Sequence, residues 1–339
     1  MTRGLYGKVP TDTLNRIVFP FLGIETRDVV VGPGPGQDAA VLRLNDEFLV
    51  ASVDPITAAE EDIGWLAVNI SANDVAVSGA RPRWFLSNIL LPQRFDTKSL
   101  ESVVEELHSA AERLEITVIG GHTEWTPELK KPLIVGTCLG LTHKYFASST
   151  ARPGDRIILT KGAGLEGAFV LASTLEDELI QKLGDSIVSQ ALALRESISV
   201  VDEAMALSPC EGLTAMHDPT ESGLALGLHE LSEASNVGIE VVESQIVLPE
   251  AVRRISEALG VDPLSLLSSG ALMATVKPEY TEEALALLDP LDVHAQIIGE
   301  ITRSSDCIIV KRDGSRASLP KPTSDEIWRF TQNLPAKGE

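Results

Sequence analysis

The most constraining feature of the chain is a predicted β-hairpin that follows a segment rich in glycine and proline. The alternating runs Ala39–Leu44 and Phe48–Val53 indicate two antiparallel strands, and the polar residues 45–47 between them indicate the turn. Folding the chain about this turn places Asp38 opposite Asp54, and opposed side chains of an antiparallel pair lie about 5 Å apart. The sequence therefore predicts two neighbouring carboxylates at the open end of the hairpin.

Two like charges at this separation repel unless a cation lies between them. Carboxylate oxygens are the ligands that hard divalent cations prefer, so Asp38 and Asp54 are candidates for one half of a metal site. The alternative is that both are ordinary solvated residues flanking a hairpin. The hairpin by itself leaves both interpretations open.

A third carboxylate lies in a predicted helix. Residues 60–79 carry apolar residues at helical spacing, and Asp74 falls within roughly 20° of Ile63 on the helical wheel, at about 100° per residue. Asp74 thus interrupts the face that should be buried, where a charge is costly unless it is paired or bound to a metal. It is a candidate metal ligand, or else one member of a structural ion pair with Arg81 or Arg83.

Composition restricts the partners and the compartment. The 339 residues carry a formal net charge of −21, which disfavours nucleic acids and anionic membranes as partners. Three scattered cysteines are too few for a disulfide framework, and no apolar run reaches the ~20 residues that span a bilayer. We expect a cytoplasmic protein of two domains, 1–152 and 153–339, with the boundary at the turn residues 151–155.

Two further segments contain glycines beside polar residues. A predicted strand runs directly into Gly120-Gly121-His122-Thr123, where the glycines permit close backbone approach to a ligand and Thr123 offers a hydroxyl to phosphate. His122 is either a metal ligand or a hydrogen-bonding loop residue. The turn at residues 161–167 enters a helix and predicts either an anion-binding N-terminus or a tight turn without a ligand.

The segment from Met216 to Gly223 opens another predicted helix. Asp218 as N-cap, Pro219 at the first helical position and Glu221 at the third position form a capping arrangement that needs no function to explain it. His217 precedes this cap and is expected to face the cleft between the domains.

The order and spacing of these motifs resemble the PurM-like ATP-binding superfamily. That superfamily includes aminoimidazole ribonucleotide synthetase, thiamine-monophosphate kinase, selenophosphate synthetase and the hydrogenase-maturation protein HypE, to which the resemblance is strongest. Six segments in series carry it: Gly36-Gln37-Asp38-Ala39-Ala40, Ser52-Val53-Asp54, Asn73 to Pro82, Gly120-Gly121-His122-Thr123, His217-Asp218-Pro219-Thr220 and Ser269-Gly270-Ala271-Leu272.

The resemblance implies an α/β (α+β) fold with two domains. The N-terminal domain would pair with its twin in a homodimeric β-barrel, and an α/β sandwich-like C-terminal domain would pack beside it. It also implies ATP and magnesium as cofactors, with roles for three groups of residues. These are the metal ligands Asp38, Asp54, Asp74 and His122, the ATP-binding residues Gly36, Asp38, Asn73, Gly120, Gly121 and Thr123, and the catalytic residues His217 and Asp218.

The sequence also departs from the HypE pattern. His122 stands where HypE and the kinases carry Asp, and imidazole favours manganese, cobalt or zinc over magnesium. Glu221-Ser222 replaces Arg-Gly, and the last seven residues lack the Pro-Arg-Ile-Cys tail whose cysteine carries the group that HypE dehydrates.

Three functions are compatible with these features. The first is an enzyme that uses the γ-phosphate of ATP to activate a small-molecule acceptor. The second is a metal-dependent phosphohydrolase of the manganese type, and the third is a nucleotide-binding maturation factor without turnover.

Overall fold

The predicted hairpin is present, with a shorter turn than expected. Strand β2 (Ala40–Leu44) pairs with β3 (Glu47–Ile56), from Ala40 opposite Ala51 to Leu44 opposite Glu47. The turn has two residues, and Asn45 takes the left-handed φ of 54° that such turns require. Continued beyond β2, this register brings Asp38 level with Val53, so the predicted pairing of Asp38 with Asp54 is wrong by one residue.

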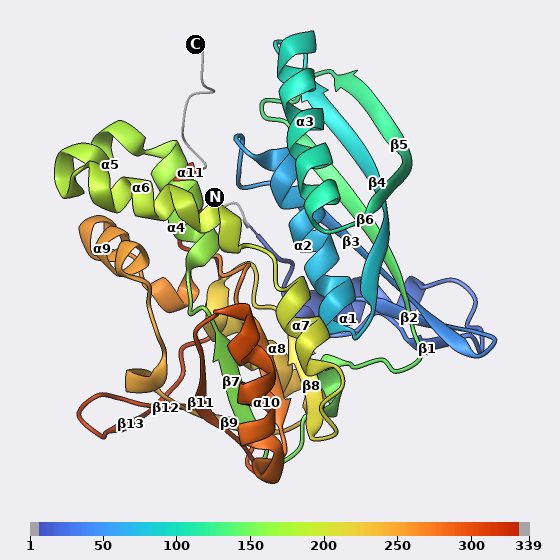
Figure 1. The fold of residues 1–339 in the computed structure, drawn as a ribbon, viewed down its shortest axis with the longest axis vertical. Helices are drawn as coiled ribbons and strands as arrows, with labels where there is room; N and C mark the ends of the chain where they lie inside the picture. Colours follow the sequence, from blue (N-terminus) through green and yellow to red (C-terminus); the bar gives the residue numbers. More distant parts are fainter. Residues whose placement is uncertain (1–6, 332–339) are drawn as a thin grey trace.

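The computed structural model describes residues 7–331, and its N-terminal part is built on a six-stranded sheet (Figure 1). The strand order is β1-β2-β3-β6-β4-β5. All neighbouring strands are antiparallel except β4 and β5, which are parallel and are joined by helix α3. The other strands and helices of the N-terminal part are β1 (Val29–Val31), β4 (Arg81–Pro92), β5 (Thr117–Thr126), β6 (Leu133–Thr142), α1 (Thr11–Ile17), α2 (Ile63–Val77) and α3 (Thr97–Arg113).

Helix α2 is the central element of the molecule. All fifteen of its residues are buried, because it packs on the sheet through β3 and β6, on α3, and on α7 (Val201–Leu207) of the C-terminal part. Asp74 is 6% exposed, which confirms that a carboxylate lies in the buried part of this helix.

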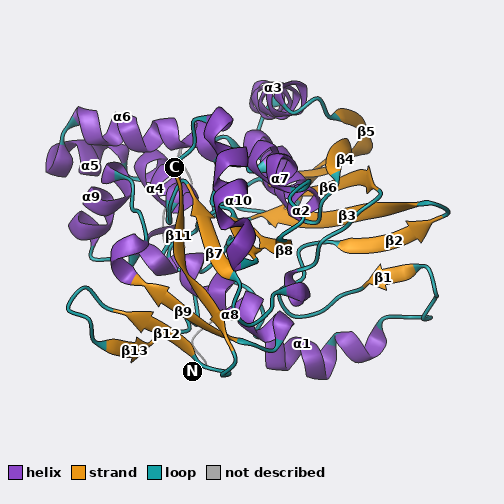
Figure 2. Cartoon of the chain, turned by 60° about the horizontal axis from the view of Figure 1, so that its bottom comes forward, coloured by secondary structure: helices purple, strands orange, loops and turns teal. Residues whose placement is uncertain are grey.

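The C-terminal part contains a seven-stranded mixed sheet in the order β13-β12-β9-β11-β7-β10-β8. Figure 2 shows the two sheets in separate parts of the molecule, with α2 and α7 between them. The strands of the seven-stranded sheet are β7 (Arg156–Thr160), β8 (Leu213–His217), β9 (Gly238–Val242), β10 (Met273–Val276), β11 (Ala295–Thr302), β12 (Cys307–Val310) and β13 (Arg316–Ser318). Its remaining helices are α4 (Leu165–Thr174), α5 (Glu176–Leu183), α6 (Asp185–Ala193), α8 (Gly223–Ser235), α9 (Glu250–Leu259), α10 (Thr281–Leu288) and α11 (Trp328–Thr331).

One hydrophobic core extends through both parts, from Val41 in β2 through α2 to Ile158 in β7. A second core lies within the C-terminal part, at residues 151–319. Asn73 of α2 adds polar contacts, since its amide nitrogen donates to the carbonyl of Ile198, 2.9 Å away, and its amide oxygen accepts from the backbone of Val200, 2.8 Å away. The relative position of the two parts is therefore fixed by packing and hydrogen bonds together.

Two smaller expectations are answered by the fold. All three cysteines are free and buried, which confirms that they form no disulfide framework. Within residues 7–331, no helix has the length and apolar character needed to cross a bilayer. The C-terminal residues in which the HypE-like tail is missing lie outside the described residues.

Candidate metal and nucleotide site

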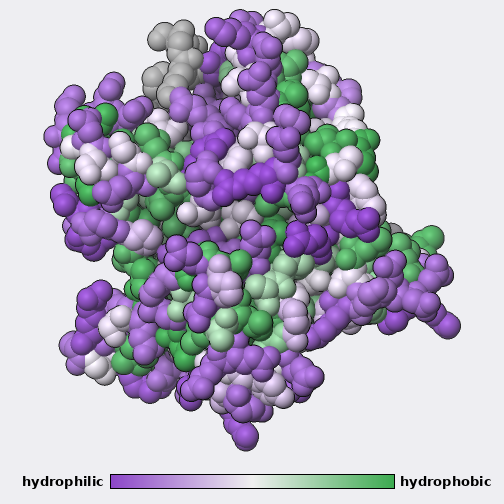
Figure 3. All heavy atoms as spheres, viewed as in Figure 1, coloured by the Kyte–Doolittle hydropathy of each residue, from purple (hydrophilic) through white to green (hydrophobic). Residues whose placement is uncertain are grey.

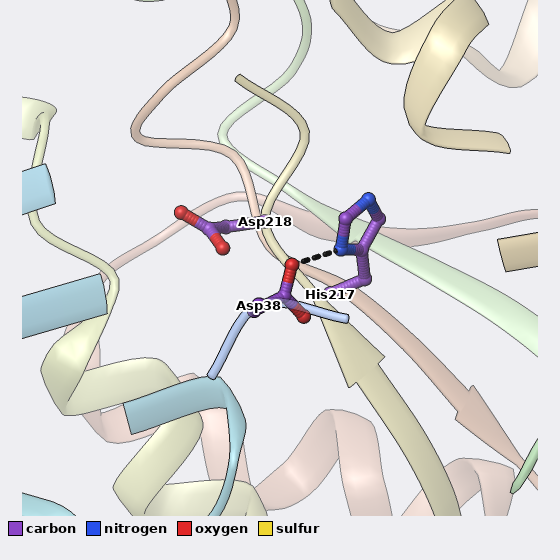
Figure 4. A group of neighbouring side chains, drawn as sticks. All are labelled: Asp38, His217 and Asp218. Atoms are coloured by element: carbon purple, nitrogen blue, oxygen red, sulfur yellow. Dashed lines mark hydrogen bonds and ion pairs between the residues drawn. The ribbon is translucent and has the colours of Figure 1, made fainter. Parts of the chain in front are cut away.

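The loop before β2 meets the end of β8 at the junction of the two parts. One carboxylate oxygen of Asp38 lies 2.6 Å from Nδ1 of His217 (Figure 4). The other accepts a hydrogen bond from the Ser148 hydroxyl at 2.9 Å. His217 is the last residue of β8 and is 2% exposed. The fold thus joins a residue predicted to bind metal with one predicted to be catalytic, 179 positions apart in the chain.

His217 is held between two carboxylates. Its Nε2 lies 3.3 Å from Glu230 of α8, which also pairs with Lys8 at 3.1 Å. Burial alone would lower the pKa of His217, but the adjacent charges of Asp38 and Glu230 outweigh it and raise the pKa to about 10. At neutral pH a ring with this pKa is an imidazolium that donates on both sides and orients Asp38.

Asp218 is buried without compensation. It is 1% exposed, and neither of its oxygens has a hydrogen-bond partner within the described part of the chain. Burial and the charge of Asp38 raise its pKa well above the ordinary value, although His217 opposes the shift. Figure 4 shows its carboxylate beside that of Asp38 rather than directed at the imidazole.

The capping role predicted for Asp218 is wrong. Helix α8 begins only at Gly223, and its N-cap is Ser222 in a left-handed conformation. The backbone N–H of Ser222 donates to Asp325, a residue near the end of the described chain, which fixes the later start of the helix. Asp218 is consequently left free of any capping contact.

Asp54 and Asp74 form a second carboxylate pair beside this group. Burial raises the pKa of Asp74 well above its ordinary value, and the charges of Asp54 and Asp218 raise it further. Burial also raises the pKa of Asp54, and a hydrogen bond to Asp74 opposes this shift. The two acidic groups are near enough to share a proton.

The neighbours of Asp74 show whether it forms the ion pair that is the alternative to metal binding. The Ser52 hydroxyl donates to Asp74, so its contacts are a hydroxyl and another acid rather than a cation. Of the two arginines proposed as partners, Arg83 stacks on Trp84 with its guanidinium 4.8 Å from the ring centre. The ion-pair interpretation of Asp74 is therefore not supported.

The residues that converge here suit a cation bound by oxygen. Atoms of Asp38, His217 and Asp218 lie within 4.8 Å of one another, and Asp54 and Asp74 act electrostatically on the same group. Four carboxylates in a partly buried space repel one another, and both oxygens of Asp218 lack a hydrogen-bond partner among the described residues. A divalent cation with hard oxygen ligands fits this donor set.

The glycine pair, His122 and Thr123 lie elsewhere in the same chain. Counting partners across the sheet, Asp54 of β3 faces Gly136 of β6, which faces Ser87 of β4, which faces Gly121 of β5. Three strand spacings of about 4.8 Å put β5 roughly 14 Å from Asp54. His122 is exposed there and contacts Glu124 at 3.0 Å.

Gly121 has a structural explanation. A side chain at Gly121 would bring its Cβ to 2.0 Å from the carbonyl oxygen of Ser87. The register between β4 and β5 shifts at Phe85 and Leu86, which is where this close approach begins. Within one chain, therefore, the structure does not bring Gly120, Gly121, His122 and Thr123 to the carboxylates.

Asn73 and Gly36, two other residues predicted to bind the cofactor, make contacts within the protein itself. Both ends of the Asn73 side-chain amide are bonded to backbone 198–200. At Gly36, with φ of 65°, a Cβ would lie 2.7 Å from the carbonyl oxygen of Glu230. Gly36 thus allows the Asp38 loop to approach α8 closely.

Most N–H groups of the glycine-rich turn at residues 161–167 are already hydrogen-bonded. The N–H of Gly164 donates to the Ser268 hydroxyl, and that of Ala163 to the carbonyl of Val247. The informative residue of this segment is Glu166, 3% exposed in the first turn of α4. Sequence reasoning missed it, although an acid inside an apolar helical run is the signal that identified Asp74.

Comparison with known families places this arrangement in context. The N-terminal domain model of the AIR synthase related proteins matches residues 36–142, and the corresponding C-terminal domain model matches residues 152–311. The chain belongs to the AIR synthase related family and has its PurM-like two-domain fold.

Several relatives that match the chain have names from hydrogenase maturation. The hydrogenase expression/formation protein HupE of Azotobacter chroococcum mcd 1 is 32% identical over 81% of each chain. The carbamoyl dehydratase HypE of Azotobacter vinelandii is 32% identical over 74% of this chain and 72% of its own. The crystal structure of Escherichia coli HypE is 28% identical, has a TM-score of 0.73, and covers 83% of this chain and 88% of its own. The chain is an enzyme of this family.

Proposed function

We propose that this protein is an ATP-dependent enzyme that transfers or hydrolyses the γ-phosphate to activate a small-molecule acceptor. In this proposal Asp38, Asp54, Asp74 and Asp218 hold magnesium, or manganese in its place. The observation that carries the proposal is the meeting of these four carboxylates from both parts of the chain, with two oxygens of Asp218 unused.

The metal would supply the positive charge that the phosphates need, because the described surroundings of the site are acidic. Oxygen ligands alone favour magnesium or manganese over zinc. The residues of this chain do the positioning. Ser148 and the imidazolium of His217 fix the two oxygens of Asp38, and Ser52 fixes Asp74.

Relatives and structural neighbours support a nucleotide in this setting. A HypE with a TM-score of 0.71 and 24% identity was crystallised with ATP, and a ThiL with a TM-score of 0.72 and 19% identity was crystallised with AMPPCP and TMP. Both share the fold. The relatives named carbamoyl dehydratase support a phosphate-driven activation, while the acceptor of this chain is a separate question.

The phosphohydrolase alternative depends on His122 as a metal ligand. His122 is exposed on β5, roughly three strand spacings from Asp54, so the observation that favoured this alternative does not hold within one chain. We therefore favour the ATP-dependent enzyme.

Calorimetric titration with a non-hydrolysable ATP analogue tests the proposal. We expect binding that requires magnesium or manganese and is lost in the Asp74→Asn variant. The control is Glu178→Gln, which removes an exposed charge paired with Lys182 on α5. Binding that is equally strong without a divalent cation, or in Asp74→Asn, would contradict the proposal.

We also propose that the N-terminal sheet mediates a homodimer. Its β5 is exposed along its length and carries the large apolar side chains of Val118, Ile119 and Trp125, and hydrophobic atoms gather on the side of the molecule where β5 lies (Figure 3). Val53 of β3 is also 61% exposed. Pairing with a second copy would cover these side chains, as the barrel expected from the sequence requires.

A further inference from the structure

A cavity of about 470 Å³ opens beside Asp54, between the N-terminal sheet and the start of α4. Ile56, Ile70 and Leu267 contribute apolar walls, and Trp328 of α11 is a further wall residue. This volume and lining are those of a small-molecule site. Of the four carboxylates of the proposed metal site, Asp54 is the one that also lines this cavity.

The charged residues of the cavity are mostly acids. Asp54, Glu166 and Glu221 line it, and Lys8 is the one cationic side chain among its described lining residues. The ammonium of Lys8 is paired with Glu230 at 3.1 Å, so its charge is shared with the His217 group. An acidic cavity of this kind repels phosphate and attracts cations.

Glu166 is the decisive residue. It is 3% exposed, and its Oε2 has no hydrogen-bond partner within residues 7–331. Ser269, which is fully buried and also lines the cavity, adjoins Glu166 and lowers its pKa through a hydrogen bond, against the rise caused by burial. The unsatisfied Oε2 of Glu166 in the cavity wall is the group that a bound ligand would complete.

Glu221 also lines the cavity and is held in place by a hydrogen bond. Its Oε1 accepts a hydrogen bond of 2.8 Å from the indole N–H of Trp328. Burial raises the pKa of Glu166 to about 7, and the charges of Asp325 and Glu221 add to the shift while Ser269 opposes it. The acids therefore act on one another across a small space, which a cationic group would relieve.

We propose that this cavity binds the acceptor substrate, and that the acceptor carries an ammonium or amidinium group on a small apolar body. Glu166 and Glu221 receive the cationic group, Ser269 accepts or donates one hydrogen bond, and the apolar walls hold the body. This inference rests on the proposed function, because it identifies the chemistry of the acceptor for the same site.

The test uses the full chain, saturated with magnesium and the non-hydrolysable ATP analogue. Benzylamine and agmatine serve as cationic probes, benzyl alcohol as the neutral counterpart of the first, and benzoate as the anionic one. We expect at least one cationic probe to bind by calorimetry, and benzyl alcohol and benzoate to bind at least about tenfold more weakly.

Variants assign the effect to the cavity. Glu166→Gln keeps the shape and removes the charge, and we expect it to weaken probe binding about tenfold or more. Glu221→Gln is a second variant in case the first does not fold, as judged by circular dichroism, and Glu178→Gln on α5 is the control that should bind normally. Unchanged probe binding in both cavity variants would overturn the inference.

Two further outcomes also count against it. If benzoate binds better than the amines, or if no amine binds while the nucleotide does, the acceptor chemistry is wrong and the proposed function stands. If the amines compete with the ATP analogue, the cavity is part of the nucleotide site. Failure of the proposed function gives a different result, namely loss of metal-dependent nucleotide binding in the wild-type chain.

Discussion

The carboxylate group at the domain junction and the strand β5 are both expected from the sequence to bind ligand, yet they differ in almost every physical respect. Asp74 and Asp218 are buried and Asp38 and Asp54 are partly buried, the four come from both parts of the chain, and Asp218 has no hydrogen-bond partner among the described residues. The β5 residues are exposed on the outer strand of a sheet, and His122 already has a contact with Glu124. Similar motifs in one chain thus need not form one site, and the position of a strand in its sheet decides where its residues lie.

The largest effect on stability is expected on replacing His217, the buried histidine at the domain junction, rather than His122, the exposed histidine on β5. Replacing His217 by Gln leaves Asp38 and Glu230 without their shared cation, and breaking a buried pair in this way costs about 3–5 kcal/mol of the free energy of unfolding. Urea unfolding at pH 6 measures this loss. An equal loss of unfolding free energy on replacing exposed His122 by Gln would show that the carboxylate group and β5 do not differ in this respect.

The same variant has a defined pH dependence. The pKa of His217 is about 10 when folded, above the ordinary value of about 6.5, so its stabilisation is complete below pH 6.5 and is lost as the pH rises toward 10. The difference in unfolding free energy between wild type and His217→Gln should shrink from pH 6 to pH 10. A constant difference would show that the imidazolium is not the stabilising form.

The next largest effect concerns metal-dependent nucleotide binding. Asp74→Asn should weaken it at least roughly 100-fold, because an oxygen ligand loses its charge. His122→Asn should change it by less than about threefold if the site is complete in one chain. A similar loss in both variants, measured by calorimetry, would show that β5 belongs to the site.

A smaller effect of opposite sign is expected for stability without metal. Asp218→Asn removes a buried and unpartnered charge, so it should raise the free energy of unfolding by about 1–2 kcal/mol in the presence of a chelator.

The pH dependence of this gain checks its origin. Because the folded pKa of Asp218 lies above its ordinary value, the destabilisation by the wild-type residue fades as the pH falls and the group protonates. The gain should therefore decrease toward pH 4. Magnesium should stabilise the wild type and leave the variant unchanged.

The smallest effect on the single chain is expected for Ile119→Asp on β5. Ile119 is 53% exposed, so the change should leave the stability of the monomer within about 0.5 kcal/mol while dissociating the proposed dimer. Light scattering after size exclusion measures the mass. Loss of nucleotide binding together with the dimer would place β5 at the site through a second copy.

The sequence predicts the carboxylates better than their surroundings. Asp74 is found because an acid in an apolar helix signals a cost that the fold must offset, and burial confirms the signal. Asp38 and Asp54 are found from a hairpin whose register is one residue off, since the turn length depends on the left-handed conformation of Asn45. Local patterns therefore identify the residues without fixing their geometry.

Other features depend on contacts between distant segments. The cap predicted at Asp218 fails because Asp325 binds the N–H of Ser222 and moves the start of α8. The bonds of Asn73 to residues 198–200 and the cavity beside Glu166 likewise join segments far apart in the sequence. No local pattern contains this information.

The complete burial of α2 has a consequence for how the protein unfolds. Because α2 belongs to a core that extends into both parts, and Asn73 bonds it to the backbone of the other part, opening of either part disrupts this core, although a second core lies wholly within residues 151–319. We expect a single cooperative calorimetric transition for both parts, with amide exchange in α2 proceeding only through global unfolding. The site at the junction would then be assembled whenever the chain is folded, so ligands would bind with little cost in ordering the protein.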